Sequence, residues 1–343
     1  MKDRILMELK ENMNKFVSGE KLSVELGISR TAIWKHINEL RKEGYEILSS
    51  SKKGYKLCSV PDIINLYEIS HGLGTQTIGS DIKYFDVIDS TNNYAKKIAQ
   101  EGCKEGTVVV ADTQTLGRGR LGRSWDSPGG KGIWLSVVLR PEMPPYDAQI
   151  ITLAASVAVV LAIKNTTGIE AQIKWPNDIL LGGKKVCGIL TEMNSEMDRI
   201  NYLVLGIGIN INQQKEDFPE ELWDTATSIS LYANENNLPM TTLRRSDIIK
   251  NMLRELEIIY KKVCTGKTVD ILEQWKRYSA VLDRKIRVIY KNSEIIGVAR
   301  EVTKDARLVV DCDDGVTREI ISGEVSVRGL DGSIALLNKT NNK

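Results

Sequence analysis

The fold class of this chain is decided by residues 171–193, which read AQIKWPNDILLGGKKVCGILTEM. Three runs within this stretch, at 171–175, 178–181 and 185–193, have the length and composition of β-strands. Gly182 and Gly183 join the second run directly to the third, which is typical of a tight hairpin. Strands joined in this way are antiparallel, so the stretch argues against the parallel sheet of a doubly wound fold.

The regions on either side extend this sheet. Further strands are predicted at 82–88, 107–112, 132–139 and 202–210, and helices at 92–100, 150–163, 245–263 and 269–278. Strands and helices do not alternate regularly along the chain, so the pattern predicts the α+β class. We expect residues 63–280 to form a central α/β domain with a mixed, largely antiparallel sheet.

Residues 1–62 predict a separate domain, a winged helix-turn-helix. Helices are predicted at 2–16, 20–26 and 30–43, and short strands that form the wing at 45–48 and 55–57. Gly27 breaks the chain between the last two helices, and Ser29 can cap the third.

The third helix of this domain is expected to enter the major groove of DNA, because the second helix of a helix-turn-helix motif does so. The side chains expected to face DNA are Arg30, Thr31, Trp34, Lys35 and Asn38 on the helix, and Lys52 and Lys53 at the tip of the wing. Two alternatives stay open from the residues alone. The motif could serve packing or protein contacts, and Trp34 could be a core or dimer contact.

Charge is distributed in a way that suits this prediction. The 343 residues carry 47 Lys and Arg against 45 Asp and Glu, whereas residues 1–60 carry 12 against 8. The basic excess therefore lies at the end of the chain where DNA binding is predicted. A composition of 42% hydrophobic and 27% charged residues excludes a wholly disordered chain.

Cysteine and histidine usage points to a reducing compartment without a zinc site. The five cysteines include no CxxC pair, and the two histidines, His36 and His71, are far apart. The amino-terminal residues lack the apolar core of a secretory signal, and the apolar run at 150–163 is too short to span a membrane. We expect a cytoplasmic protein with no membrane partner.

The most unusual stretch is GRGRLGRSW at 117–125. It formally contains GxGxxG, but the Asp-Ser-Pro-Gly-Gly that follows cannot begin a helix, so a dinucleotide fingerprint is excluded. Its glycines let backbone amides approach an anion, and Arg118, Arg120 and Arg123 carry forked donors suited to carboxylate or phosphate. We expect an anion-binding loop, with a merely solvated basic loop as the alternative.

A second group of polar residues lies around the deciding hairpin. Asn177 and Asp178 stand at a strand junction, and Lys185 begins the strand after the two glycines. A lysine there could stabilise charge that develops on a phosphoryl group. Lys184 is its direct neighbour, so the sequence does not decide which of the two lysines has this role.

Taken in order, five motifs resemble those of the biotin protein ligases: Ser90-Thr-Asn92, GRGRLGRSW at 117–125, KWPNDIL at 174–180, KVCG at 185–188 and GIGIN at 206–210. With the winged helix in front, the chain resembles the bifunctional type that is both ligase and biotin operon repressor. The resemblance implies that biotin and ATP, with Mg²⁺, react to biotinyl-5'-adenylate. Biotin is then transferred to a lysine of an apo biotin carboxyl carrier protein domain.

Site roles follow from the same resemblance. The residues expected to bind biotin are Ser90, Thr91, Asn92, Gln114, Arg118, Gly119, Arg120 and Lys185, and those expected to bind ATP are Arg123, Trp125, Asn177, Asp178 and Asn210. Lys185 and Arg118 are expected to be catalytic. The residues assign no metal ligand.

The carboxy-terminal part predicts a small all-β module. Short strands at 285–290, 295–302, 308–311, 316–321 and 325–328 suggest an SH3-like barrel over residues 281–335. The module resembles the family's carboxy-terminal cap, which assists ATP and acceptor binding, although an inert stabilising module would have the same pattern.

The resemblance also implies regulation. The adenylate-loaded protein is expected to form a homodimer and to bind operator DNA of biotin synthesis or uptake genes as a repressor. The alternatives are a biotin ligase without gene regulation and a non-catalytic biotin-sensing transcription factor. The complete arginine loop, Asn177 and Lys185 argue against the last of these, because a sensor does not need to stabilise charge at a phosphate.

Overall fold

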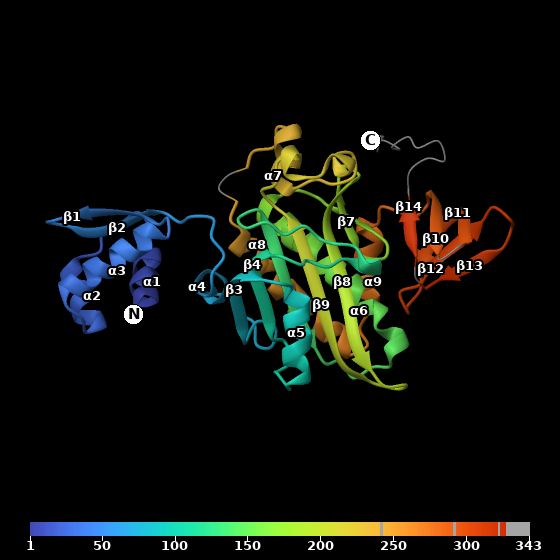
Figure 1. Ribbon diagram of the computed structural model, residues 1–343, viewed down its shortest axis with the longest axis horizontal. Coiled ribbons are helices and arrows are strands. Elements are labelled where there is room, and N and C mark those ends of the chain that lie inside the picture. Colours follow the sequence, from blue (N-terminus) through green and yellow to red (C-terminus); the bar gives the residue numbers. More distant parts are fainter. Residues whose placement is uncertain (241–242, 291–292, 322, 327–343) are drawn as a thin grey trace. The chain divides into compact units, whose positions relative to one another are not determined.

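The computed structural model describes residues 1–240, 243–290, 293–321 and 323–326. The chain divides into two compact units, Met1–Ile63 and Ile64–Lys343, which are treated separately below (Figure 1). The predicted end of the third domain at 335 and the end of its last predicted strand at 328 lie outside the described residues.

The first unit is the winged helix-turn-helix that the sequence predicts. It contains helices α1 (Lys2–Glu11), α2 (Gly19–Leu26) and α3 (Arg30–Lys42), and the antiparallel strands β1 (Glu46–Ser50) and β2 (Gly54–Ser59). Ile5, Leu9, Ile33 and Ile37, which lie at helical spacing, are fully buried between the helices. The Ser29 hydroxyl accepts the backbone N–H of Ala32 and so caps α3 as predicted.

The first helix is shorter than predicted, because it ends at Glu11 and not at Phe16. Asn14 has a positive φ of 62°, which ends the helical path. The chain then runs beside the wing: the backbone N–H of Asn14 donates to the carbonyl of Leu57, and Val17 exchanges two backbone hydrogen bonds with Tyr55. Pairing with the second wing strand therefore replaces the last predicted turns of the helix.

The second unit is built on a seven-stranded sheet. Its strands are β3 (Ile82–Ile88), β4 (Val108–Gln114), β5 (Gly132–Leu139), β6 (Gln172–Lys174), β7 (Asp178–Leu181), β8 (Lys184–Ser195) and β9 (Ile200–Asn210), in the order β3-β4-β5-β9-β8-β7-β6. β3 and β4 are parallel, and the other paired neighbours in the sheet are antiparallel. The predicted mixed, largely antiparallel sheet is confirmed.

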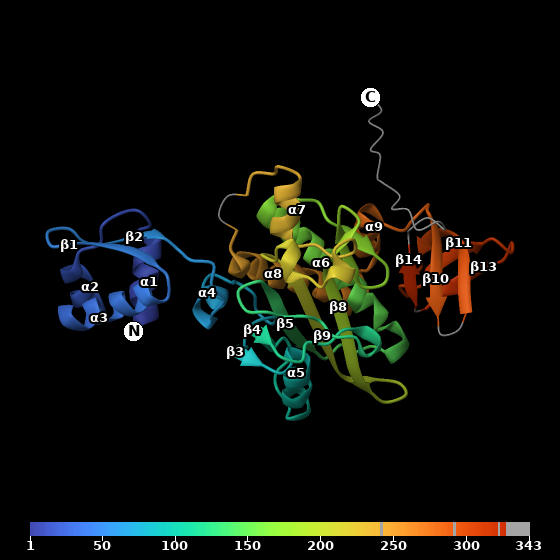
Figure 2. The same ribbon diagram turned by 45° about the horizontal axis from the view of Figure 1, so that its top comes forward.

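Helices cover both faces of this sheet (Figure 2). Helices α6 (Gln149–Thr167), α8 (Arg245–Cys264) and α9 (Val269–Tyr278) share one apolar core with strand residues such as Val110 and Leu205. Helix α5 (Thr91–Gln100) packs on the opposite face against Val109, Val138 and Val204. Alternate strand residues thus point to two different helix layers, as the pleat of a strand requires.

Helix α6 is longer than the predicted 150–163. The segment Pro145–Thr167 is long and apolar enough to cross a membrane by length and composition, but 78% of its apolar window is buried inside the protein. A helix that is apolar on all sides is expected when the sheet covers one side and α8 another. Helices α4 (Leu66–Ser70) and α7 (Ile229–Glu235) were not predicted, because each is too short for a clear apolar repeat.

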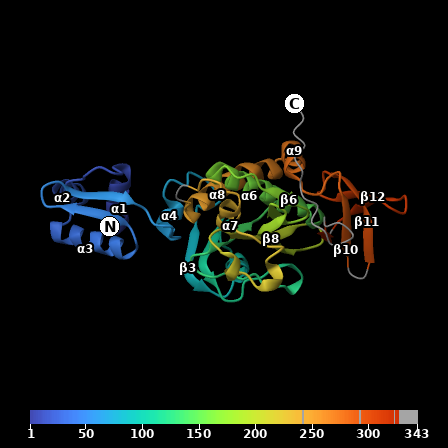
Figure 3. The ribbon, with the colours of Figure 1, turned by 90° about the horizontal axis from the view of Figure 1, so that it is seen from above.

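The carboxy-terminal strands form an antiparallel sheet of their own, part of which is seen from above in Figure 3. The strands are β10 (Lys285–Tyr290), β11 (Ser293–Val302), β12 (Leu308–Cys312), β13 (Thr317–Ile320) and β14 (Glu324–Ser326), in the order β13-β12-β11-β10-β14. Buried Trp175 donates its indole N–H to the carbonyl of Ala306 over 3.1 Å. This bond fixes the small sheet to the turn between β6 and β7.

Candidate active site

A pocket of about 730 Å³ opens between the central sheet and the edge of the small carboxy-terminal sheet. Its size lies within the range of sites for small molecules and cofactors. Every residue that the sequence assigned to the two ligands lines it: Ser90, Thr91, Asn92, Gln114, Arg118, Gly119, Arg120, Arg123, Trp125, Asn177, Asp178, Lys185 and Asn210. Residues spread over more than a hundred positions of sequence are thus brought together in one cavity.

One end of the pocket is a network of uncharged side chains at the first turn of α5. Gln114 Oε1 accepts hydrogen bonds from the backbone N–H and the hydroxyl of Thr91, over 2.8 and 3.1 Å. Ser136 Oγ lies 2.8 Å from Thr91 Oγ1 and 2.6 Å from Asn92 Oδ1. A Cβ at Gly206 would lie 2.1 Å from Asn92 Oδ1, so only glycine fits there. These groups form a rigid hydrogen-bonding surface without a net charge.

Lys185 reaches the pocket because of a β-bulge. Ile179 pairs with Cys187 but the next residue, Leu180, pairs with Lys185, so Val186 is an extra residue in β8. Such a bulge moves the preceding side chain to the other face of the strand. Lys185 therefore shares the pocket face with Gly188, where a Cβ would lie 3.3 Å from Lys185 Nζ.

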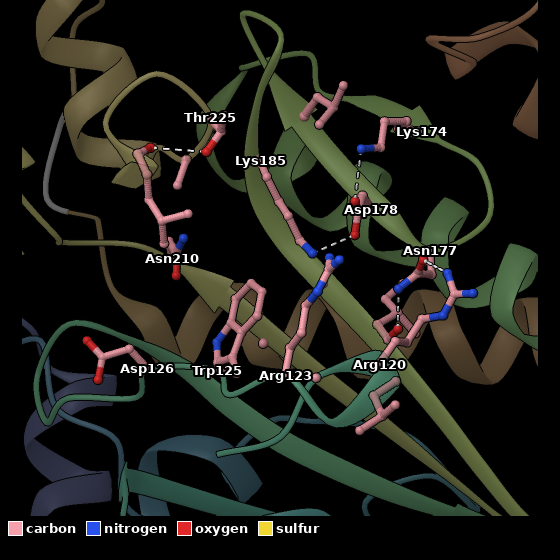
Figure 4. A pocket seen from close by; sticks show the side chains of 18 of the residues that line it. Arg120, Arg123, Trp125, Asp126, Lys174, Asn177, Asp178, Lys185, Asn210 and Thr225 are labelled. Atoms are coloured by element: carbon pink, nitrogen blue, oxygen red, sulfur yellow. Dashed lines mark hydrogen bonds and ion pairs between the residues drawn. The ribbon is translucent and has the colours of Figure 1, made fainter. Parts of the chain in front are cut away.

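The structure also decides between the two neighbouring lysines. Lys184 Nζ donates to the carbonyl of Trp223 over 2.9 Å and does not line the pocket. Lys185 Nζ lies 2.6 Å from Asp178 Oδ1 and 5.2 Å from the centre of the Trp125 ring (Figure 4). Of these two neighbours, Lys185 is consequently the one that lines the cavity.

Asp178 is held between two ammonium groups, since its other oxygen lies 3.2 Å from Lys174 Nζ. Burial works to raise the pKa of Asp178, but the charges of Lys185 and Lys174 outweigh it and hold that pKa below its ordinary value. The carboxylate therefore stays ionised at neutral pH. Lys174 belongs to the KWPNDIL motif, but no role was predicted for it from the sequence.

The arginines of the loop at 117–125 point in different directions. Arg120 Nη1 donates to Asn177 Oδ1 over 2.7 Å, and Asn177 Nδ2 donates to the carbonyl of Ile189 (Figure 4). Burial lowers the pKa of Arg120, although an arginine stays charged at neutral pH. Arg123 forms an ion pair with Glu324 of β14, and this hydrogen-bonded contact raises the pKa of Arg123. Arg120 and Arg123 thus both line the cavity, and each contacts a partner from another part of the chain.

Trp125 lies flat on glycine residues of two strands. A Cβ at Gly208 would lie 2.6 Å from its Nε1, and a Cβ at Gly188 would lie 2.8 Å from its Cζ3. The glycines of the KVCG and GIGIN motifs are therefore needed to make room for the indole. Its N–H is buried without a hydrogen-bond partner among the described residues. A flat aromatic face in a pocket suits the stacking of a base.

Asn210 lies at the same end of the pocket and its amide is fixed on both sides. Asn210 Nδ2 donates to the carbonyl of Thr227 over 3.1 Å, and its Oδ1 accepts from Gln213 Nε2 over 3.0 Å. Gln213 is 3% exposed and lines the pocket, although no sequence motif predicted it as a site residue. Ser136 was not predicted either, and its one signal is that it is a polar residue inside the apolar strand GIWLSVVL.

The predicted DNA-contacting residues belong to the other unit. Arg30, Thr31, Trp34 and Lys35 are exposed along α3, and Lys52 and Lys53 are exposed at the tip of the wing. Trp34 is 57% exposed, which excludes a role in the core. Asn38 is partly buried and accepts a hydrogen bond from Arg41, a residue that also binds the carbonyl of Ile47 and so fixes the wing to α3.

Comparison with known proteins follows the same division of the chain. The model of the biotin/lipoate A/B protein ligase family matches residues 84–210, that of an HTH domain matches residues 2–56, and that of the biotin protein ligase C terminal domain matches residues 281–328. The bifunctional ligase/repressor BirA of Bacillus subtilis is 42% identical over 92% of this chain and 94% of its own length.

Two further relatives extend the comparison. The bifunctional ligase/repressor BirA of Escherichia coli is 31% identical over 91% of this chain and 93% of its own length. Among solved structures, the biotin protein ligase from Aquifex aeolicus in complex with biotin and ATP superposes with a TM-score of 0.61 at 27% identity. It covers 73% of this chain and 99% of its own.

Proposed function

The chain belongs to the biotin protein ligase family, and we propose that it is a bifunctional protein, a biotin ligase and a repressor of biotin genes. As a ligase it joins biotin to a lysine of an acceptor protein and converts ATP to AMP and diphosphate. The observation that carries the proposal is Lys185, which the bulge in β8 places in the pocket between ionised Asp178 and the Trp125 ring.

We assign biotin to the uncharged network at α5 and the nucleotide to the side of Trp125 and Asn210. The ureido ring of biotin carries no net charge, so it suits hydroxyl and amide partners such as Thr91 and Gln114. The adenine ring suits the flat face of Trp125 and the fixed amide of Asn210. The biotin carboxylate and the α-phosphate then meet near Lys185, Arg118 and Arg120.

In the first step, a carboxylate oxygen of biotin forms a bond to the α-phosphorus of ATP. The bond from that phosphorus to the oxygen of the β-phosphate breaks, and diphosphate leaves. Two anions must approach each other, and negative charge builds up at the α-phosphate. Fixed cations in a site that excludes water lower this barrier, which is the role of Lys185.

Mg²⁺ is expected to accompany ATP in this reaction. Among the residues that the structure describes, no group of three His, Cys, Asp or Glu side chains could hold a metal ion. Asp178 is already paired with two lysines. The side chains of the pocket therefore do not build a metal site by themselves, and Mg²⁺ would be held mainly by the phosphates of ATP.

In the second step, the amine of an acceptor lysine attacks the carbonyl carbon of the biotinyl-adenylate. An amide bond forms, the bond from that carbon to the phosphate oxygen breaks, AMP leaves and the amine loses a proton. The acceptor is an apo biotin carboxyl carrier protein domain. The carboxy-terminal sheet contributes to the nucleotide side of the cavity through Glu324, Val325 and Ser326.

As a repressor, the adenylate-loaded protein forms a homodimer that places two winged helices on the half-sites of an operator. The exposed row on α3 and the lysines of the wing provide the contacts to bases and phosphates. We place both activities in the cytoplasm, in keeping with the five cysteines, all of which are free thiols.

Two measurements on one preparation test the two activities separately. The ligase predicts ATP–diphosphate exchange that depends on biotin, and transfer of biotin to a carrier domain. The repressor predicts that biotin with MgATP tightens binding to DNA from upstream of biotin genes, about tenfold or more, relative to scrambled DNA at the same salt concentration. Exchange without specific DNA binding would leave a ligase that does not regulate those genes. Specific DNA binding without ATP–diphosphate exchange would indicate a biotin-sensing transcription factor that is not a ligase.

A further inference from the structure

The carboxylate of Glu192, on β8, lies where three polar groups from other elements converge. Asn92 Nδ2 donates to its Oε2 over 2.9 Å, and Lys96 Nζ donates to its Oε1 over 3.0 Å. Arg118 Nη1, from the arginine loop, lies 3.5 Å from the same Oε1. Glu192 itself does not line the pocket, so it acts on the site only through these neighbours.

Glu192 decides how the side chain of Asn92 is oriented. Asn92 is 5% exposed, and its Oδ1 is already engaged by Ser136 over 2.6 Å. With its oxygen on Ser136 and its nitrogen on Glu192, the amide has one orientation. The same Ser136 hydroxyl contacts Thr91, whose own hydroxyl donates to Gln114. The carboxylate is therefore continuous with the hydrogen-bonded surface that we assign to biotin.

Glu192 also holds the beginning of the arginine loop. Arg118 Nη1 donates to Asn93 Oδ1 over 3.0 Å, and Glu192 provides the nearby negative charge. Lys96 stands one turn after Asn92 on α5 and binds the same carboxylate. One acidic side chain thus links the first turns of the helix to the loop at 117–125, which lines the pocket.

The carboxylate of Glu192 is ionised at neutral pH. Burial works to raise the pKa of Glu192, but the hydrogen bonds from Asn92 and Lys96, with the nearby charges of Lys96 and Arg118, hold it below its ordinary value. A neutral residue of the same shape would keep at most part of the contact with Asn92. It would lose the attraction for the two cations.

We propose that Glu192 is a positioning residue for biotin: it orients Asn92 and holds Arg118 against α5, so that both side chains are placed at the biotin end of the pocket. The inference rests on the proposed function, because it assumes that biotin binds beside α5. Glu192 would act on biotin binding although it does not line the pocket and so contacts neither ligand.

The test uses the full chain with Glu192→Gln and Glu192→Ala, and with Glu196→Gln as the matched control. Glu196 lies in the turn that follows β8, and its carboxylate contacts exposed Arg199 and Asn201, away from the pocket. We expect KM for biotin to rise about tenfold in Glu192→Gln and further in Glu192→Ala, because one charge-assisted hydrogen bond changes affinity by about this factor. KM for ATP should change less than twofold, and the control should match the wild type.

A second readout does not depend on activity. Trypsin cuts after arginine, so cleavage after Arg118, mapped by mass spectrometry at saturating biotin, reports how firmly this side chain is held. Cleavage at that position should be several times faster in both Glu192 variants than in Glu196→Gln, with the thermal midpoints of all variants alike. Biotin affinity and cleavage unchanged in both variants would overturn the inference, as would a rise in both Michaelis constants together. A wild type that binds no biotin would instead refute the proposed function.

Discussion

The two ends of the pocket differ in the charge of the side chains that form them. At α5, Thr91, Asn92, Gln114 and Ser136 bind one another as uncharged donors and acceptors, and the charge of Glu192 stays behind them. Away from α5, Lys174, Lys185, Arg120 and Arg123 line the cavity itself, and the carboxylate of Asp178 holds the two lysines. Arg118, beside Glu192, is the cation that lines the cavity at α5. Under the proposed assignment of the two ligands, the difference means that cations are concentrated where charge develops in the reaction, whereas the uncharged ring is recognised by hydrogen bonds.

The largest expected effect tests the charged end. Lys185→Ala should lower the rate of biotin-dependent ATP–diphosphate exchange by about 30- to 1000-fold, that is about 2–4 kcal/mol, because it removes the cation that we propose stabilises the developing charge. The drop should appear in kcat and not only in KM. Lys184→Ala is the matched control, since Lys184 binds a carbonyl outside the pocket, and its exchange rate should stay near that of the wild type. Equal losses in the two variants would contradict the assignment.

A pair of glycine substitutions separates the two ends. Gly206→Ala forces a methyl group against Asn92, and Gly208→Ala forces one against Trp125. Overpacking of this kind costs about 1–3 kcal/mol, so each change should weaken its own ligand about tenfold or more. We expect Gly206→Ala to raise KM for biotin and Gly208→Ala to raise KM for ATP, in steady-state measurements with each substrate varied in turn. If either variant affected both constants equally, the division of the pocket would be wrong.

The smallest kinetic effect is expected away from both ends, at Glu257 of α8. Its carboxylate accepts the backbone N–H groups of Gln76, Thr77 and Ile78. Burial raises the pKa of Glu257, but these bonds outweigh it and lower that pKa to about 2. The folded pKa thus lies below the unfolded one, near 4.3, so this stabilisation is present at neutral pH and is lost as the pH falls toward about 2.

Glu257→Gln should therefore lower the melting temperature by a few degrees at pH 7, about 1–2 kcal/mol, with kcat and both Michaelis constants unchanged. The difference between wild type and variant should shrink as the pH approaches 2, measured by differential scanning calorimetry across pH. A constant difference at every pH would mean that lost packing, not lost charge, is responsible.

Much of the fold was predictable because apolar spacing is a local property. The strands and long helices of the central sheet were predicted within a few residues, and the Gly182-Gly183 hairpin indicated its antiparallel part correctly. The first helix was predicted too long, because the helical spacing of apolar residues continues after Glu11, whereas the backbone there pairs with the wing. Pairing between segments about 40 residues apart in sequence leaves no local signal.

The sequence by itself determined which residues meet: the motifs around Arg118, Asn177 and Asn210 were recognisable, and all of them line one cavity. Only the tertiary structure decided how they work. The bulge at Val186 turns Lys185, and not Lys184, toward the pocket. The packing of α5 on the sheet brings Ser136 of β5 and Glu192 of β8 into hydrogen-bond contact with Asn92. The physical reason is that the direction of a side chain depends on the pairing register of its strand, and register is set by partners distant in the chain.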